Sequence, residues 1–299
     1  MSVEAPFLVF FILHLVIGAV LPARGDTRPL LARFFEGIVD AIAQRLDRLG
    51  RSRGVLFVRG AVVALVLSAA VLWAGRWLES LVSAQSTLSF TLYLVFLLLA
   101  VDVMAGVKAA QKLSRTLTQD DFKKADGHTQ ARQMLGDAAL CLSLYFTGPV
   151  LALVLGLDVA LLYVLLAAFY RVLFLRGAFG FVAVGLHQVL NFIPAVCAVL
   201  LVAAASLFVA GANMLRVFKV SANKGWRTEY GVTGWPLAAL AGALNVTLGG
   251  PPCAWVGPKG SSAKVIVENL KAAALLQFIV YIFFAALFSG AVAARHIFA

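Results

Sequence analysis

Two adjacent glycines, Gly249 and Gly250, begin the part of the sequence that is best suited to binding chemistry. Two prolines follow at once, and then a polar cluster made of Lys259, Ser261, Ser262 and Lys264. Adjacent glycines leave backbone N–H groups bare and permit positive φ, which is how loops cradle anions. A phosphate-binding loop is one interpretation, with the helix start expected at Pro236 as a further set of donors. A tight turn in a membrane-protein loop accounts for the same residues.

The histidines and cysteines do not form a known metal or catalytic motif. The four histidines lack HExxH spacing and the three cysteines lack CxxC spacing, so neither pattern indicates a zinc site. The sequence also lacks a GxSxG nucleophile elbow and a GxxxxGK[ST] phosphate loop. Any ATP would therefore be bound without a P-loop.

The elements that must position these residues are apolar helices. Hydrophobic residues make up 62% of the 299 and charged residues only 13%, whereas soluble domains have about half and about a quarter. Several runs approach the roughly 20 residues that span a bilayer: Ala5 to Leu21, Val55 to Gly75, Leu88 to Val103 and Ala273 to Ala293. The first run has Glu4 where a signal peptide would be basic, so we expect it to be a permanent span.

The net charge of +11 comes from basic residues beside these spans, which is typical of orientation by cytoplasmic Lys and Arg and not of nucleic-acid binding. We therefore place three loops, 22–54, 105–136 and 212–272, on the cytoplasmic side of a bacterial inner membrane. In the first loop, apolar residues recur at helical spacing between Pro29 and Gly50. This pattern predicts an amphipathic helix in the membrane interface.

Residues 137–211 contain three apolar stretches, 137–156, 158–175 and 178–211, but basic loops on both sides require an even number of crossings. We therefore predict two full spans and one re-entrant or broken segment, with the break at Pro194. A kinked but continuous helix is the alternative. The predicted fold is an all-α, polytopic membrane bundle of about six spans, forming one domain over residues 1–299.

Three segments resemble the CobD/CbiB family of cobalamin-biosynthesis membrane proteins. The stretch from Trp235 to Pro251, which includes Asn245, resembles the family's C-terminal signature, and the run from Leu190 through Asn191 to Pro194 resembles its Asn-aromatic-apolar-Pro segment. The helix expected over 105–116, with the acidic turn after it, is similar to the family's charged helix.

The resemblance implies an adenosylcobinamide-phosphate synthase. Such an enzyme joins an aminopropanol, or its phosphate, to a carboxylate of the corrinoid adenosylcobyric acid as an amide, using ATP and magnesium. The ligand-binding residues that we carry over, together with the anion-loop candidates above, are Asn191, Pro194, Trp235, Asn245, Gly249, Gly250 and Lys259.

The acidic motifs of the family are altered in this chain. Where the family has Gly-Arg-Asp-Thr, this sequence has Asp126-Gly-His128-Thr129, and the acidic stretch that follows keeps only Asp137. These four residues are the catalytic candidates, and Asp120 and Asp121 are the candidate metal ligands. Two alternatives stay open: a non-catalytic relative similar to the AmpE proteins, which are proposed sensors, and an accessory subunit that packs against membrane-protein partners or a second copy of itself.

Overall fold

The computed structural model describes residues 6–13, 28–47, 50–82, 86–103, 105–116, 125–226, 228–251 and 253–298. Over these residues the chain is an all-α helical bundle, as predicted, with one short hairpin that was not predicted. The helices are α2 (Leu30–Leu46), α3 (Arg53–Val82), α4 (Ser86–Ala100), α5 (Ala105–Thr116), α6 (Ala125–Leu142), α7 (Gly148–Leu155), α8 (Leu157–Leu173), α9 (Phe181–Leu190), α10 (Phe192–Ala205), α11 (Met214–Val220), α12 (Gly234–Leu244) and α13 (Val267–Phe298).

Short elements complete the chain. The π-helical segments η2 (Ser143–Thr147) and η3 (Ser221–Gly225) follow α6 and α11, and the 3₁₀ turn η4 (Gly231–Thr233) precedes α12. Strands β1 (Leu248–Gly249) and β2 (Trp255–Val256) pair antiparallel, with Leu248 opposite Val256 and Gly249 opposite Trp255. The twin glycines therefore lie at the base of a hairpin loop.

Three helical stretches among the described residues are long and apolar enough to cross a membrane: Arg53–Leu81, Gly127–Leu155 and Val267–Gly290. The broken pair α9 and α10 would make a fourth. Most of the predicted span from Ala5 to Leu21 lies outside the described residues. The helix Thr87–Ala100 is apolar but shorter than a full crossing. The total of about six spans stays a prediction.

The described chain forms two compact units, each assembled from separated segments. The first unit contains residues 1–10, 28–102 and 144–192, and the second contains 11–27, 103–143 and 193–299. The single domain over 1–299 stays a prediction, because each unit is described here by itself.

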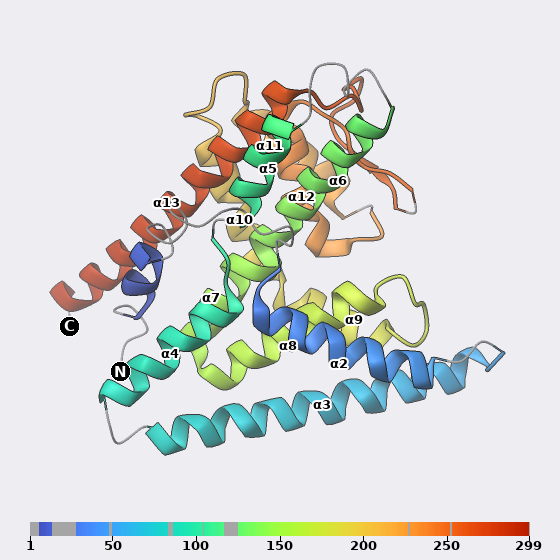
Figure 1. Ribbon diagram of the computed structural model, residues 1–299, viewed down its shortest axis with the longest axis vertical. Helices are drawn as coiled ribbons and strands as arrows, with labels where there is room; N and C mark the ends of the chain where they lie inside the picture. The colour runs from blue at the N-terminus through green and yellow to red at the C-terminus, as the bar shows by residue number, and fades with distance from the viewer. Residues whose placement is uncertain are drawn as a thin grey trace. The chain divides into compact units, whose positions relative to one another are not determined.

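In the first unit, α8 packs against α2, α3, α7 and α9 (Figure 1). Its core holds the buried rings of Tyr145, Tyr163 and Tyr170. Gly148 lies against Tyr163, whose phenol ring occupies the space that a Cβ there would need. The buried Glu36 of α2 accepts a 2.6 Å hydrogen bond from Tyr145.

Polar contacts mark one end of this unit. Arg176, after α8, pairs with Asp40 at 3.0 Å and lies 3.8 Å from Asp47. Arg59, near the start of α3, donates a 3.4 Å hydrogen bond to the carbonyl of Leu46. The end of α8 and the beginning of α3 are thus both tied to α2.

A second polar cluster lies where α3 ends and α8 begins. Arg76 pairs with Asp158 at 3.0 Å, and Glu79 accepts a 2.7 Å hydrogen bond from the amide of Leu157. The Glu79 carboxylate thereby satisfies a free N–H group of the first turn of α8. Helices α3 and α8 therefore run in opposite directions between two polar ends.

In the second unit, α5 packs against α13 and α6, and α12 packs against α6 and α11 (Figure 1). Helix α12 is buried over Pro236–Leu244, because its small alanines and Gly242 allow close approach. A Cβ at Gly242 would lie 2.8 Å from the carbonyl oxygen of Arg216 on α11. Asn245 ends the helix in the left-handed conformation, with φ 56°.

One local prediction is corrected, and another is confirmed in part. The helix break lies at Asn191, between α9 and α10, and not at Pro194. Pro194 belongs to the first turn of α10, where a proline costs little because that turn has free N–H groups anyway. Helix α2 begins after Pro29 as predicted and ends at Leu46; it is amphipathic, with Phe35, Val39 and their neighbours packed on protein and Leu30 and Phe34 exposed, and its place in the membrane interface stays a prediction.

Candidate functional site

One face of α6 forms a wall of a cleft of about 430 Å³ in the second unit. The lining residues of α6 recur at helical spacing: Thr129, Arg132, Gln133, Gly136, Asp137 and Leu140. The opposite wall comes from Tyr230, Leu237 of α12 and the hairpin residues Gly249, Gly250, Pro251 and Trp255. We call this the α6 cleft.

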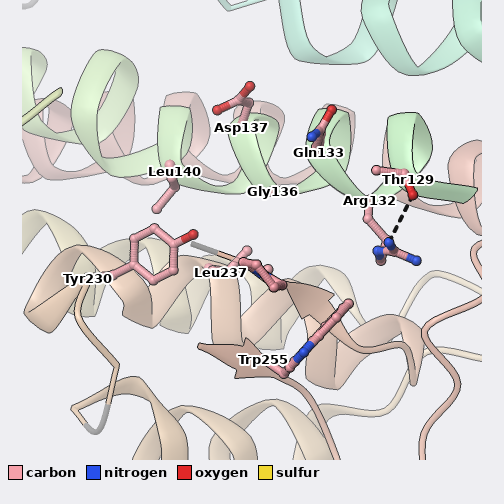
Figure 2. Close-up of a pocket in the computed structure, with 12 residues that line it drawn as sticks. Thr129, Arg132, Gln133, Gly136, Asp137, Leu140, Tyr230, Leu237 and Trp255 are labelled. Atoms are coloured by element: carbon pink, nitrogen blue, oxygen red, sulfur yellow. Dashed lines mark hydrogen bonds between the residues drawn. The ribbon is translucent and has the colours of Figure 1, made fainter. Parts of the chain in front are cut away.

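Arg132 is fixed in place at the hairpin side of the α6 cleft. Its guanidinium donates to the carbonyl of Ala263 at 2.9 Å and to the hydroxyl of Thr129 at 3.1 Å. It also lies over the ring of Trp255, 5.1 Å from the ring centroid, in a cation–π contact. Figure 2 shows Arg132 extending from α6 toward Trp255, with its hydrogen bond to Thr129 dashed.

The twin glycines are needed because the hairpin is tight. Gly249 has φ 77° and Gly250 has φ 108°, so both adopt the positive φ that the sequence predicts. A Cβ at Gly250 would lie 2.9 Å from the indole ring of Trp255, and one at Gly249 would lie 2.6 Å from the carbonyl of Ala254. Gly250 thus lets the Trp255 ring pack on bare backbone.

Tyr230 supplies a hydroxyl to the α6 cleft. Burial raises the pKa of this phenol, and a hydrogen bond with Cys253 and the negative charges of Asp137 and Glu229 raise it further. The hydroxyl, which is protonated at neutral pH, is held by this contact with Cys253. In Figure 2 it points toward α6.

Glu229 is hydrogen-bonded to the hairpin loop. Its exposed carboxylate accepts a 2.9 Å hydrogen bond from the amide of Ala254, directly before Trp255. That hydrogen bond lowers the pKa of the carboxyl group. The ionised side chain therefore helps to fix the start of β2.

A second cleft, of about 620 Å³, lies on the other side of the hairpin and shares Trp255 with the first. Four cationic side chains line it: Arg216 and Lys219 of α11, Lys224 of η3 and Lys259. The described residues that line it include no carboxylate. We call it the basic cleft.

The structure brings four predicted site residues together, since Thr129, Asp137, Gly249 and Gly250 all line the α6 cleft. Lys259 lines the basic cleft instead. Asp120 and Asp121 lie outside the described residues, and of Asp126 only the backbone, in α6, is described.

The other predicted residues have local structural contacts. His128 Nδ1 is 2.7 Å from the carbonyl oxygen of Val265. Trp235 packs edge-on against Trp226, with ring centroids 4.9 Å apart, and covers Gly225.

Asn191 belongs to the first unit, where its side chain accepts a 2.6 Å hydrogen bond from Tyr163. Pro194 is buried in α10, and Asn245 caps α12.

Sequence reasoning missed Arg132, Tyr230 and Trp255. A signal for Arg132 was present, because Thr129, Arg132 and Asp137 fall on one helical face. Trp255 carried no such signal, since its place depends on the pairing of β1 with β2.

Comparison of the chain with protein-family models, with curated proteins and with solved structures finds no match.

Proposed function

We propose that the chain is an integral membrane protein of the bacterial inner membrane. Exposed apolar side chains follow the length of α3, including Val58, Val62, Leu65 and Trp73. The polar contacts of Arg59 and Arg76 lie near the two ends of this helix. At 1.5 Å per residue these residues are about 25 Å apart, close to the roughly 30 Å of bilayer hydrocarbon.

Within this membrane protein, we infer that the α6 cleft binds the substrates of a CobD/CbiB-like reaction. One observation carries the inference: a segment of α6 at the family's altered acidic motifs and the segment that resembles the family's C-terminal signature, about 110 residues apart in sequence, line the same cleft. Thr129 and Asp137 come from the first segment, and Gly249, Gly250 and Pro251 come from the second.

The charges of the α6 cleft suit a small molecule with a cationic end and an anionic end. Asp137 can accept a hydrogen bond from an ammonium group, while Arg132 can donate to a phosphate or a carboxylate. Tyr230 and Thr129 add hydroxyl groups to the lining of the cleft. Aminopropanol phosphate has this pattern, and so does the pair of an amine and a corrinoid carboxylate.

Magnesium fits this cleft poorly on the described residues alone. Asp137 is the single carboxylate among the described lining residues, and the described chain has no group of three His, Cys, Asp or Glu side chains that could hold a metal ion. Magnesium is usually bound through one or two carboxylates together with substrate phosphates. We therefore assign no step to magnesium or ATP.

Binding and product formation test the proposal together. Purified protein should bind aminopropanol phosphate and adenosylcobyric acid in calorimetry, and mass spectrometry should detect the amide when ATP and magnesium are added. Asp137→Asn should weaken binding of the amine about tenfold to a hundredfold. Glu268→Gln is the matched control, because this exposed residue on α13 lies outside the lining of the α6 cleft. Failure of the wild-type protein to bind either compound would contradict the proposal.

The small number of carboxylates in the α6 cleft favours a second candidate. A non-catalytic relative on the same scaffold, acting as an AmpE-like sensor or as an accessory subunit, would need the cleft to bind but not to activate a carboxylate. This candidate predicts Asp137-dependent binding without any amide product. An accessory subunit would in addition copurify with a membrane-protein partner in a fixed ratio.

A further inference from the structure

The basic cleft is built on one face of a short helical segment. Arg216, Lys219, Val220 and Asn223 lie at i, i+3, i+4 and i+7, and Lys224 follows. Lys259 closes the cleft from the loop after the hairpin. Four positive charges in one concave surface, with the remaining amide proton of Asn223, whose other one is donated to the carbonyl of Lys219, suit an anion with several oxygen acceptors.

This basic face is held firmly in position. Asn213 caps α11 by accepting a 3.0 Å hydrogen bond from the amide of Arg216, and the Arg216 guanidinium donates to the carbonyl of Gly211 at 3.3 Å. The backbone of α11 lies directly on Gly242 of the buried α12. The nearby Glu229 carboxylate is bonded to the backbone of Ala254.

An exposed apolar face lies beside the basic one. Leu215 is 73% exposed and Phe218 is 40% exposed on α11, and Trp226 is 55% exposed just after η3. Helix α11 also begins shortly after the end of the apolar α10. Basic residues next to a membrane-spanning segment attract anionic headgroups, and exposed aromatic side chains favour the headgroup level of a bilayer.

We propose that the basic cleft binds the phosphate of an anionic phospholipid headgroup, with the glycerol and acyl chains along Leu215, Phe218 and Trp226. A soluble organophosphate would satisfy the cations equally well but would leave the apolar face without a ligand. The inference rests on the proposed membrane location and is independent of the amide-forming reaction.

The test uses the full chain in a neutral detergent and a labelled short-chain phosphatidylglycerol. Removing two cleft lysines by Lys219→Gln with Lys259→Gln should weaken binding about 25-fold, at about fivefold for each lysine. The matched control, Lys112→Gln with Lys271→Gln, removes the same charge outside this cleft and should leave binding within about twofold, since only screened long-range attraction changes. Phosphatidylcholine of the same chain length should bind far more weakly.

Two further arms separate the lipid from a soluble phosphate. The double variant Leu215→Ser with Phe218→Ser should bind phosphatidylglycerol more weakly than the wild type. Its affinity for glycerol 3-phosphate, measured by competition with the labelled lipid, should stay unchanged. The lipid assignment is overturned if glycerol 3-phosphate binds as tightly as phosphatidylglycerol. It is also overturned if the two lysine pairs lose affinity equally, which would indicate general surface charge, or if phosphatidylglycerol does not bind at all. Membrane fractionation of the same protein tests the location separately.

Discussion

Trp255 is the side chain on which both clefts depend. Its ring lies between the α6 cleft and the basic cleft, with Arg132 on one face and the bare backbone of Gly250 beside it. The ring therefore forms part of the wall of both clefts. The glycine beside it is therefore part of the site, although it contributes no functional group.

Replacing Gly250 by alanine should displace Trp255. The Gly250→Ala variant adds a Cβ within 2.9 Å of the ring and forces a residue with a side chain to φ 108°. Gly260→Ala is the matched control, because Gly260 has φ 76° but nothing near its missing Cβ. Both variants should lose about 1–2 kcal/mol of stability from backbone strain. Only Gly250→Ala should also shift the fluorescence of Trp255, and an equal shift in both would contradict this account.

At the scale of single residues, prediction from sequence succeeded for features that depend only on backbone conformation. Glycine permits positive φ, and both Gly249 and Gly250 adopt it in the structure. Trp235 was predicted to bind a ligand because of the motif it belongs to; it contacts Trp226 and Gly225, and its ligand role stays a prediction. Arg132 and Trp255 meet only after α6 and the hairpin have packed, which a linear pattern does not encode.

At the scale of elements, the hairpin is held by an ionised carboxylate, so its position should depend on pH. The pKa of Glu229 is lowered from its ordinary value of 4.5 by the amide of Ala254. Its contribution is therefore present above about pH 4.5 and is lost as the pH falls through the lowered pKa. Acidification should loosen the loop and change Trp255 fluorescence. Glu229→Gln should show the loosened spectrum at every pH, and retention of the acid transition in that variant would exclude Glu229 as its cause.

Two substitutions at the end of α12 test whether Asn245 ends the helix only or also binds a ligand. Its φ of 56° suits glycine and asparagine, so Asn245→Gly should keep stability within about 0.5 kcal/mol, and Asn245→Val should cost about 1–2 kcal/mol. If Asn245 only ends the helix, Asn245→Gly should bind aminopropanol phosphate like the wild type. Loss of binding in that stable variant would restore Asn245 to the ligand site.

The bounds of a helix were predictable where the sequence contains a clear boundary residue, such as a proline. Pro29 begins α2 as expected, and the expected helix over 105–116 coincides with α5. The helix break was predicted at Pro194 but lies at Asn191. The first turn of a helix tolerates a proline, and Pro194 belongs to the first turn of α10. The hairpin was seen only as a turn, since strands of two residues are too short to show an alternating pattern.

At the scale of the whole molecule, composition predicts a membrane bundle, and the described helices are compatible with it. The two polar ends of the first unit could not be predicted, because Arg76 and Asp158 are 82 residues apart in sequence. These two clusters distinguish one end of the first unit from the other, so the unit can be oriented across the membrane. The cluster with Asp40 and Arg176 belongs to the arginine-rich loop that we place in the cytoplasm, so the cluster with Arg76, Glu79 and Asp158 should face the other side.

Cysteine labelling tests the central claim, that the clefts of the second unit open to the cytoplasm. Single cysteines would be introduced as Arg45→Cys, Ser80→Cys and Lys264→Cys, all exposed positions, in a chain whose own three cysteines are alanine. A membrane-impermeant maleimide on spheroplasts should label position 80 alone, and positions 45 and 264 should react only after the membrane is opened. Labelling of position 264 from outside, with position 45 protected, would contradict the account.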